Sequence, residues 1–252
     1  MSFKKLPYAQ CDLCKNKKGP NPGFYYVDID VDGRQYKGVM ECECHIKWTK
    51  DNRILIGAAK SNLWNDPPFW AYDLAKNYKG VGRDFLYRQI WPFIEYAPNT
   101  ERSFYFLGRS ATQKTTVAQW VGLCFLKKGL TAHYESMQGL ITNLVPATFE
   151  DSARAKIYSD KCLNVDVLII DNAFEKGKCS IQAWQQPYME SFFRDRMEIK
   201  KKSVILVSST LPNDIEKNGF SASLQDFVTR HTEVINFLDV VYKIDNVGDI
   251  VK

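Results

Sequence analysis

A lysine and two threonines stand directly after a turn-forming segment near the middle of the chain. The run Phe104–Leu107 is apolar, Gly108 follows it, and Lys114 and Thr115 complete the pattern. This is the G-x-x-x-x-G-K-[ST] spacing of a phosphate-binding loop, with Gln113 in place of the second glycine. In such a loop, backbone N–H groups hold phosphate oxygens, the lysine reaches the outer phosphates and the threonine hydroxyl faces Mg²⁺.

The whole loop is therefore the candidate site for binding ATP. Its predicted nucleotide-binding residues are Gly108, Arg109, Ser110, Ala111, Thr112, Gln113, Lys114, Thr115 and Thr116. A side chain at position 113 costs about 1 to 2 kcal/mol if the backbone there is left-handed. Gln113 therefore weakens the motif, and an ordinary strand–turn–helix junction is the alternative interpretation.

An apolar run that ends in an acid provides the second set of candidates. Val165–Ile170 has the composition of a buried strand, and Asp171 follows it. At the carboxyl end of a strand beside the loop, Asp171 would complete the Mg²⁺ shell. The next residue is Asn172, which can orient a water molecule but cannot accept its proton. Glu175 is close enough in sequence to substitute as the base.

Two residues further along have a functional and a structural interpretation. Thr210 follows the predicted strand Ser203–Ser208, where it would sense the outer phosphate or only form a strand-to-loop turn. Arg230 stands in a predicted helix C-terminus. It would either act on the nucleotide of a neighbouring subunit or complement the helix dipole.

Four of the seven cysteines lie in the first 45 residues as two close pairs. Cys11 and Cys14 form a C-x-x-C knuckle, and Cys42 and Cys44 form the second pair. Tetrahedral Zn²⁺ accepts four thiolates donated in this way, so we predict a closed, structural zinc site. His45 is the alternative to Cys44 as the fourth ligand. The other cysteines are predicted to be small buried residues: Cys124, Cys162 and Cys179.

The elements that must position these residues alternate along the chain. Helical apolar spacing follows the loop over residues 117–127, and helical segments separate five strand-like runs. These runs are Phe104–Leu107, Thr131–Tyr134, Val165–Ile170, Ser203–Ser208 and Glu233–Phe237. The alternation predicts an α/β fold, with a parallel sheet covered by helices.

The residues before the loop divide into two parts. Gly23–Val31 and Gln35–Met40 read as strands of a hairpin that turns at Asp32-Gly33 and carries one cysteine pair back to the other. An aromatic connector follows, with helices predicted over residues 50–60 and 84–95. Its aromatic side chains either pack on the core, which we favour, or stack on nucleic-acid bases.

Composition limits the class of protein. The chain has 252 residues, a formal net charge of +5 and 45% hydrophobic residues, which suits a globular protein with one substantial domain and a small module. It has no apolar run of about 20 residues and no signal-peptide pattern, so we expect no membrane contact. The expected location is the cytoplasm, or the host cytoplasm if the chain is viral.

With these motifs in place, the chain resembles the bacterial and phage replicative-helicase loaders of the DnaC and DnaI type, related to the IstB transposition ATPases of the AAA+ class. The resemblance rests on the cysteine pairs, the aromatic connector, the loop 108–116, the run 168–172 with Glu175, Val207–Thr210 and Phe227–Arg230. It implies a five-stranded AAA+ core with a minimal lid, preceded by a zinc-ribbon-like module. The domains expected are 1–48 for zinc binding, 49–100 for the connector and 101–252 for the core.

The resemblance also implies residue roles and partners. Arg230 is placed as a finger acting on a neighbouring subunit, Lys243 as a weak candidate for a second sensor, and Arg196 in a usually basic stretch. The expected partners are a replicative helicase, single-stranded DNA and further copies of the AAA+ core. The expected cofactors are ATP, Mg²⁺ and Zn²⁺.

Three departures from the family pattern all concern nucleotide chemistry. Gln113 replaces glycine, Asn172 replaces an acid, and Thr210 stands where the family usually has asparagine. ATP is therefore either bound and hydrolysed slowly, or not bound at all. Two alternatives to a helicase loader stay open: a helicase-binding adaptor or inhibitor of a host loader that needs no nucleotide, and an IstB-like ATPase acting on duplex DNA.

Overall fold

The computed structural model describes residues 24–51, 57–58, 60–63, 73–80, 82–99, 101–145 and 151–237. The chain divides into two compact units, Met1–Gly57 and Ala58–Lys252. In these described ranges, no helix is long and apolar enough to cross a bilayer.

The first unit contains the predicted hairpin. Strand β1 (Phe24–Val31) pairs antiparallel with β2 (Arg34–Glu41), and helix α2 (Glu43–Asp51) follows. The turn is left-handed, with φ of 53° at Asp32 and 78° at Gly33. This geometry explains why an Asp-Gly pair stands there. Helix α2 begins at Glu43 and shares only residues 50 and 51 with the helix predicted over 50–60. Residues 57, 58 and 60 of the predicted range are also helical, and residues 52–56 and 59 lie outside the described part of the chain.

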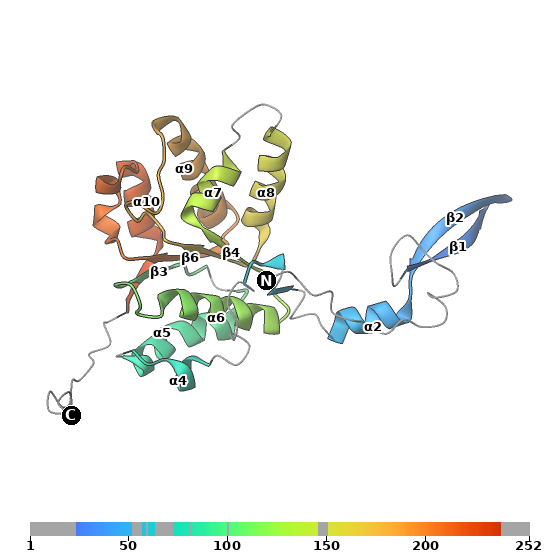
Figure 1. The fold of residues 1–252 in the computed structure, drawn as a ribbon, viewed down its shortest axis with the longest axis horizontal. Coiled ribbons are helices and arrows are strands. Elements are labelled where there is room, and N and C mark those ends of the chain that lie inside the picture. The colour runs from blue at the N-terminus through green and yellow to red at the C-terminus, as the bar shows by residue number, and fades with distance from the viewer. Residues whose placement is uncertain are drawn as a thin grey trace, which may run out of the picture. The chain divides into compact units, whose positions relative to one another are not determined.

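The second unit is built on a five-stranded parallel sheet, as predicted (Figure 1). The strands run in the spatial order β4-β5-β6-β3-β7. Their bounds are Phe104–Leu107 for β3, Ala132–Ser136 for β4, Val167–Asp171 for β5, Ser203–Ser208 for β6 and Glu233–Asn236 for β7. Strand β6 therefore lies between β3, which precedes the loop, and β5, which ends in Asp171.

Helices cover both faces of this sheet. Figure 1 shows α4, α5 and α6 on one side and α7, α8, α9 and α10 on the other. Their bounds are Leu74–Asn77 for α4, Arg83–Tyr96 for α5, Lys114–Lys127 for α6, Met137–Leu144 for α7, Ser152–Asn164 for α8, Gln186–Arg194 for α9 and Ala222–His231 for α10. Shorter turns comprise a π-helical turn at Asp195–Ile199 and 3₁₀ turns at Ala183–Gln185, Pro212–Asp214 and Glu216–Asn218.

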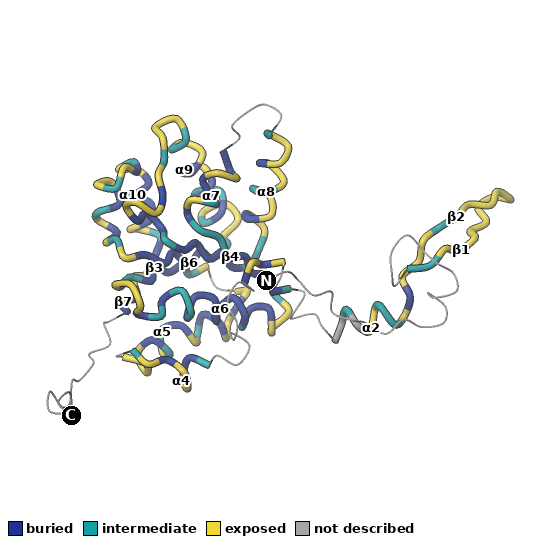
Figure 2. Tube along the Cα trace, in the orientation of Figure 1, coloured by how far each residue is buried: buried dark blue, intermediate teal, exposed yellow. Residues whose placement is uncertain are grey.

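The strands alternate between two hydrophobic cores, one on each face of the sheet. In β3, Phe104 and Phe106 pack with the α5–α6 core, whereas Tyr105 packs with the α7–α10 core. In β5, Ile169 belongs to the first core and Ile170 to the second. Successive side chains of a strand point to opposite faces, so a strand buried on both faces must be apolar throughout. Figure 2 shows these strands as buried.

The aromatic residues of the connector divide between core and surface. Tyr78 and Phe93 are buried in the α5–α6 core, which agrees with the favoured packing interpretation. Others on α5 are exposed: Phe85, Trp91 and Tyr96. Three more lie outside the described residues: Trp64, Trp70 and Tyr72.

Arg196 is fully buried, although it precedes the basic run Lys200–Lys202. Its guanidinium donates hydrogen bonds to the backbone carbonyl oxygens of Cys162, Val165 and Ser203. Burial lowers the pKa of Arg196 to about 9. This side chain therefore ties α8 to β6 and is not part of a basic surface.

The buried His133 predicts a pH dependence of stability. Neither of its ring nitrogens hydrogen-bonds any of the described residues, and burial, with Lys161 and Arg196 nearby, lowers its pKa to about 4. The unfolded chain would bind a proton below about pH 6.5, so the free energy of unfolding should fall as the pH drops from about 7 to 4. The loss should amount to about 3 kcal/mol.

We expect His133→Phe to flatten this dependence, because phenylalanine keeps an aromatic ring at this buried position and cannot titrate. Urea unfolding between pH 7 and pH 4 measures the free energy of unfolding at each pH. The control is His231→Phe, which leaves His133 in place and should keep the original slope. An unchanged slope in His133→Phe would contradict the assignment.

Candidate functional site

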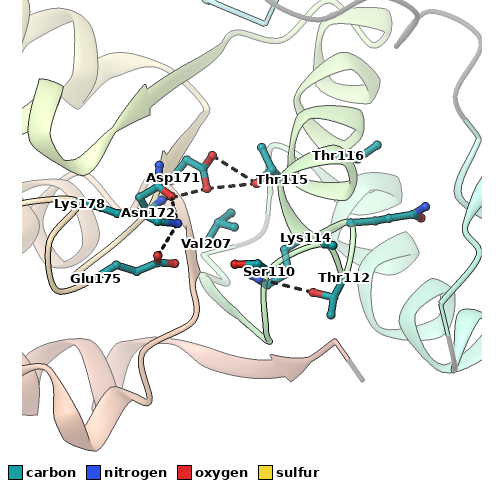
Figure 3. Close-up of a pocket in the computed structure, with 12 residues that line it drawn as sticks. Ser110, Thr112, Lys114, Thr115, Thr116, Asp171, Asn172, Glu175, Lys178 and Val207 are labelled. Carbon is teal, nitrogen blue, oxygen red and sulfur yellow. Dashed lines mark hydrogen bonds and ion pairs between the residues drawn. The ribbon is translucent and has the colours of Figure 1, made fainter. Parts of the chain in front are cut away.

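A cavity of about 270 Å³ lies where the predicted phosphate-binding loop leaves the sheet. Figure 3 shows the loop and the start of α6 on one side, and the residues at and after the end of β5 on the other. Its lining comprises Ser110, Ala111, Thr112, Gln113, Lys114, Thr115, Thr116, Asp171, Asn172, Glu175, Lys178 and Val207. The fold therefore brings the two predicted motifs to one site.

The loop has the backbone geometry that its glycine spacing suggests. A Cβ atom added at Gly108 would lie 2.5 Å from the carbonyl oxygen of Phe237, so only glycine fits there. Ala111 and Gln113 are both left-handed, with φ of 65°. The hydroxyl of Thr112 donates to the carbonyl oxygen of Arg109 at 2.9 Å and helps to close the loop.

Lys114 is the first residue of α6, and its ammonium lies inside the loop. It is buried and donates to the carbonyl oxygens of Gly108 at 2.7 Å and Arg109 at 2.6 Å. These contacts hold the cation beside the cavity.

Gln113 points its side-chain carbonyl oxygen away from the cradle, to the connector. The backbone N–H of Lys79 donates to Gln113 Oε1 at 3.3 Å. The strain of a left-handed backbone, about 1 to 2 kcal/mol, is therefore partly offset by a contact that glycine could not make. The sequence could not show this, because position 79 lies far from the loop along the chain.

Thr115 and Asp171 meet across the cavity. The hydroxyl of Thr115 lies 3.2 Å from each carboxylate oxygen of Asp171. The phenol of Tyr134, at the edge of the sheet on β4, donates to Asp171 Oδ2 at 2.6 Å. Burial and the negative charge of Asp171 raise the pKa of Tyr134, which keeps this phenol protonated as a donor. Sequence reasoning predicted a strand here but missed the role of Tyr134.

Beyond β5, the buried Glu175 forms an ion pair with the half-exposed Lys178. Its Oε2 lies 2.7 Å from the ammonium of Lys178, and its Oε1 accepts the backbone N–H of Ser209 at 2.7 Å. Burial opposes ionisation of Glu175, but these two donors outweigh it and hold the pKa of the carboxyl below its usual value. Lys178 also donates to Asn172 Oδ1 at 2.9 Å. Sequence reasoning found Asn172 and Glu175 and missed Lys178.

Thr210 and Arg230 do not line this cavity. The hydroxyl of Thr210 contacts the carbonyl oxygen of Phe174 and the side-chain amide of Asn218, so Thr210 closes a turn after β6. Arg230 is exposed in the last turn of α10, where its Nε donates to the carbonyl oxygen of Asp226 at 3.2 Å. Its exposure leaves the guanidinium accessible from outside the subunit.

Two of the predicted zinc ligands lie in the described residues. The sulfur atoms of Cys42 and Cys44 are 2.9 Å apart, and Cys42 is buried. The described ranges contain no cluster of three or more histidine, cysteine or acidic side chains that could hold a metal. Cys11, Cys14 and Lys243 lie outside those ranges.

Comparisons with known proteins agree with this geometry. No protein-family model and no curated protein matches the sequence. Among solved structures, the DnaC helicase loader is similar at 18% identity and a TM-score of 0.56, over 68% of this chain and 99% of that one. DnaI is similar at 15% identity and a TM-score of 0.55, over 69% of this chain and 92% of that one.

The replication initiator DnaA, in a structure bound to AMPPCP and single-stranded DNA, is also similar. Its identity is 20% and its TM-score 0.55, over 69% of this chain. The chain spans about half the length of the AMPPCP-bound DnaA structures that it matches. Together with the parallel sheet, these similarities show that about two thirds of the chain has the fold of the DnaC and DnaI structures.

The direction of the Gln113 side chain predicts that it does not obstruct the loop. Gln113→Gly should change the affinity for a fluorescent ATP analogue with Mg²⁺ by less than about fivefold. It should also speed hydrogen exchange at the Lys79 amide, whose acceptor is lost.

Ala111→Gly is the matched control, since residue 111 has the same φ but makes no contact with Lys79 through its side chain. It should leave the Lys79 amide protected. A tenfold or greater gain in nucleotide affinity for Gln113→Gly alone would mean that the glutamine does obstruct the loop.

Proposed function

We propose that the chain is a replication helicase loader that binds a replicative hexameric helicase through residues 1–48 and helps to place it on single-stranded DNA. The main support is its fold, which is similar to nearly the whole of the DnaC helicase loader structure. The DnaA structure bound to single-stranded DNA supports DNA of this kind as a ligand class for the fold.

The cavity supports ATP as the nucleotide. Lys114 and the backbone N–H groups of the loop 108–116 would hold the phosphates. The Thr115 hydroxyl and the Asp171 carboxylate are adjacent hard oxygen ligands, which is the donor set that Mg²⁺ prefers. When bound, Mg²⁺ would neutralise charge on the outer phosphates.

Slow hydrolysis is the activity that these residues favour. Asn172 has no acidic group, and Glu175 is the carboxylate in the cavity that could accept a proton from an attacking water molecule. Its ion pair with Lys178 lowers its basicity while the pair is in place, because the carboxylate is stabilised in its charged form, so the pair would have to open before hydrolysis. ATP would therefore act as a slowly reset switch.

The roles of three other residues depend on neighbouring copies or on other contacts. We assign Arg230 to the nucleotide site of a neighbouring subunit, since it is exposed and does not line its own cavity. This role requires self-association through the AAA+ core. We propose that Thr210 senses the outer phosphate through the turn that it closes after β6, and that Lys243 is a second sensor.

The cysteine pairs support a structural Zn²⁺ site. The thiols of Cys42 and Cys44 converge, as two ligands of one tetrahedral ion must. His45 Nδ1 is paired with Glu41, a contact that a zinc-ligating histidine also makes through its second ring nitrogen, so His45 stays the alternative to Cys44 as the fourth ligand. With Cys11 and Cys14, the module would have the four thiolates of a closed site.

Complex formation with a hexameric replicative helicase tests the proposed function. We expect a defined complex by mass photometry, and transfer of the helicase to single-stranded rather than duplex DNA when ATP is present. A complex that forms equally well without nucleotide and transfers no helicase would indicate an adaptor or inhibitor. ATP-dependent coating of duplex DNA without helicase binding would indicate an IstB-like protein.

Lys114→Ala should abolish ATP binding, because it removes the cation held at the loop. Equilibrium titration with a fluorescent ATP analogue and Mg²⁺ measures the loss, with Lys127→Ala as the control on the exposed end of the same helix. Zinc content should be the same in both variants. Unaltered ATP affinity in Lys114→Ala would disprove the loop assignment.

Cys42→Ser should remove bound zinc, because it takes one thiolate from a closed four-ligand site. Metal analysis should find about one zinc ion per chain in the wild type and much less in the variant. Cys162→Ser, a buried cysteine of the second unit, is the control and should retain zinc. A wild type without zinc would exclude the metal site.

A further inference from the structure

Lys178 is a residue of the cavity to which neither predicted motif assigns a role. It follows β5 on a loop, and its half-exposed side chain extends into the cavity that Lys114 also lines. Its ammonium lies 2.7 Å from Glu175 Oε2 and 2.9 Å from Asn172 Oδ1 (Figure 3). A lysine ammonium has three N–H donors on a flexible stem, so these contacts can be exchanged.

Apart from the Mg²⁺ proposed above, the side chains of the cavity supply no net positive charge for the outer phosphate. Lys114 and Lys178 are balanced by Asp171 and Glu175, so the charged side chains that line the cavity sum to zero. A terminal phosphate carries roughly 1.5 to 2 negative charges at pH 7. Lys114 is tied to loop carbonyl oxygens, whereas Lys178 is half-exposed on the facing wall.

We propose that Lys178 distinguishes nucleoside triphosphate from diphosphate by leaving Glu175 for the outermost phosphate. This inference rests on the proposed nucleotide binding at the loop. A diphosphate lacks the group that Lys178 would contact, so the ion pair with Glu175 would persist in its presence. Lys178 is then a specificity-determining residue of the site.

Glu175 is held in place for such an exchange. Its other oxygen accepts the backbone N–H of Ser209, and the residue is only 7% exposed, so the carboxylate keeps its position when Lys178 moves. Without its cation, Glu175 is a stronger base beside the triphosphate. The movement of Lys178 to the triphosphate would therefore also activate Glu175 as a base.

The alternative is a purely structural role, in which Lys178 only fastens the loop between Asn172 and Glu175. A structural role would change the affinities for triphosphate and diphosphate together. The proposed exchange would change the affinity for triphosphate alone. The ratio of the two affinities therefore separates the two roles.

The test is equilibrium binding of AMPPCP, which is not hydrolysed, and of ADP to the full chain with Mg²⁺. For Lys178→Met we expect the AMPPCP affinity to fall about tenfold or more, with ADP affinity changed less than about threefold. Lys176→Met is the matched control, since Lys176 is exposed on the same loop but does not line the cavity. An AMPPCP-to-ADP ratio unchanged in Lys178→Met would overturn the inference.

Two further variants keep the inference testable if Lys178→Met disturbs the loop. Lys178→Arg retains the charge and should keep most of the preference for AMPPCP. Glu175→Gln releases Lys178 and should raise that preference, and a fall in it would overturn the exchange.

Failure of the proposed function has a different signature. If the wild type binds neither nucleotide, both the proposed nucleotide site and the proposed role of Lys178 are wrong. If Lys114→Ala loses both nucleotides while Lys178→Met keeps the wild-type ratio, only the role of Lys178 falls.

Discussion

The carboxylate of Asp171 is the group on which the arrangement of the site depends. It accepts hydrogen bonds from the Thr115 hydroxyl on α6, the Tyr134 phenol on β4 and the backbone N–H of Asn172. A buried carboxylate is costly unless such donors surround it. Because Thr115 and Tyr134 lie on other elements, satisfying this one group holds the start of α6 and β4 to the end of β5. The cavity forms between them.

The phosphate-binding loop tolerates a missing glycine for a local reason. The left-handed backbone at Gln113 carries a cost, but its side chain leaves the cradle free and contacts the connector at Lys79. Gly108 has no such freedom, because a Cβ there would meet the backbone of Phe237. Position 108 of the motif is therefore restricted to glycine by a steric contact. Position 113 is restricted only by its left-handed backbone.

The polar groups of the core divide into permanent and exchangeable contacts. The buried Arg196 holds three carbonyl oxygens and is fixed by them, since its charge could not be left unpaired there. Lys178, half-exposed at the cavity, has acceptors that a phosphate could replace. The two cations differ in their access to solvent: Arg196 has none and is structural, whereas Lys178 is accessible and suited to binding a ligand.

Much of the second unit could be predicted from the sequence, because strand periodicity, the loop spacing and the acid at the end of β5 are local patterns. The runs at 104–107 and 203–208 match β3 and β6 residue for residue, and in the first unit Asp32-Gly33 forms the expected turn. The roles of Tyr134, Lys178 and the Gln113 side chain, and the burial of Arg196, were decided only by tertiary structure. Tyr134, Gln113 and Arg196 depend on contacts between positions far apart along the chain, such as the 37 residues that separate Tyr134 from Asp171. Lys178 has local hydrogen-bond partners, but only the fold places it in the same cavity as Lys114. Such contacts exist only once the parallel sheet has brought the ends of its strands to one edge.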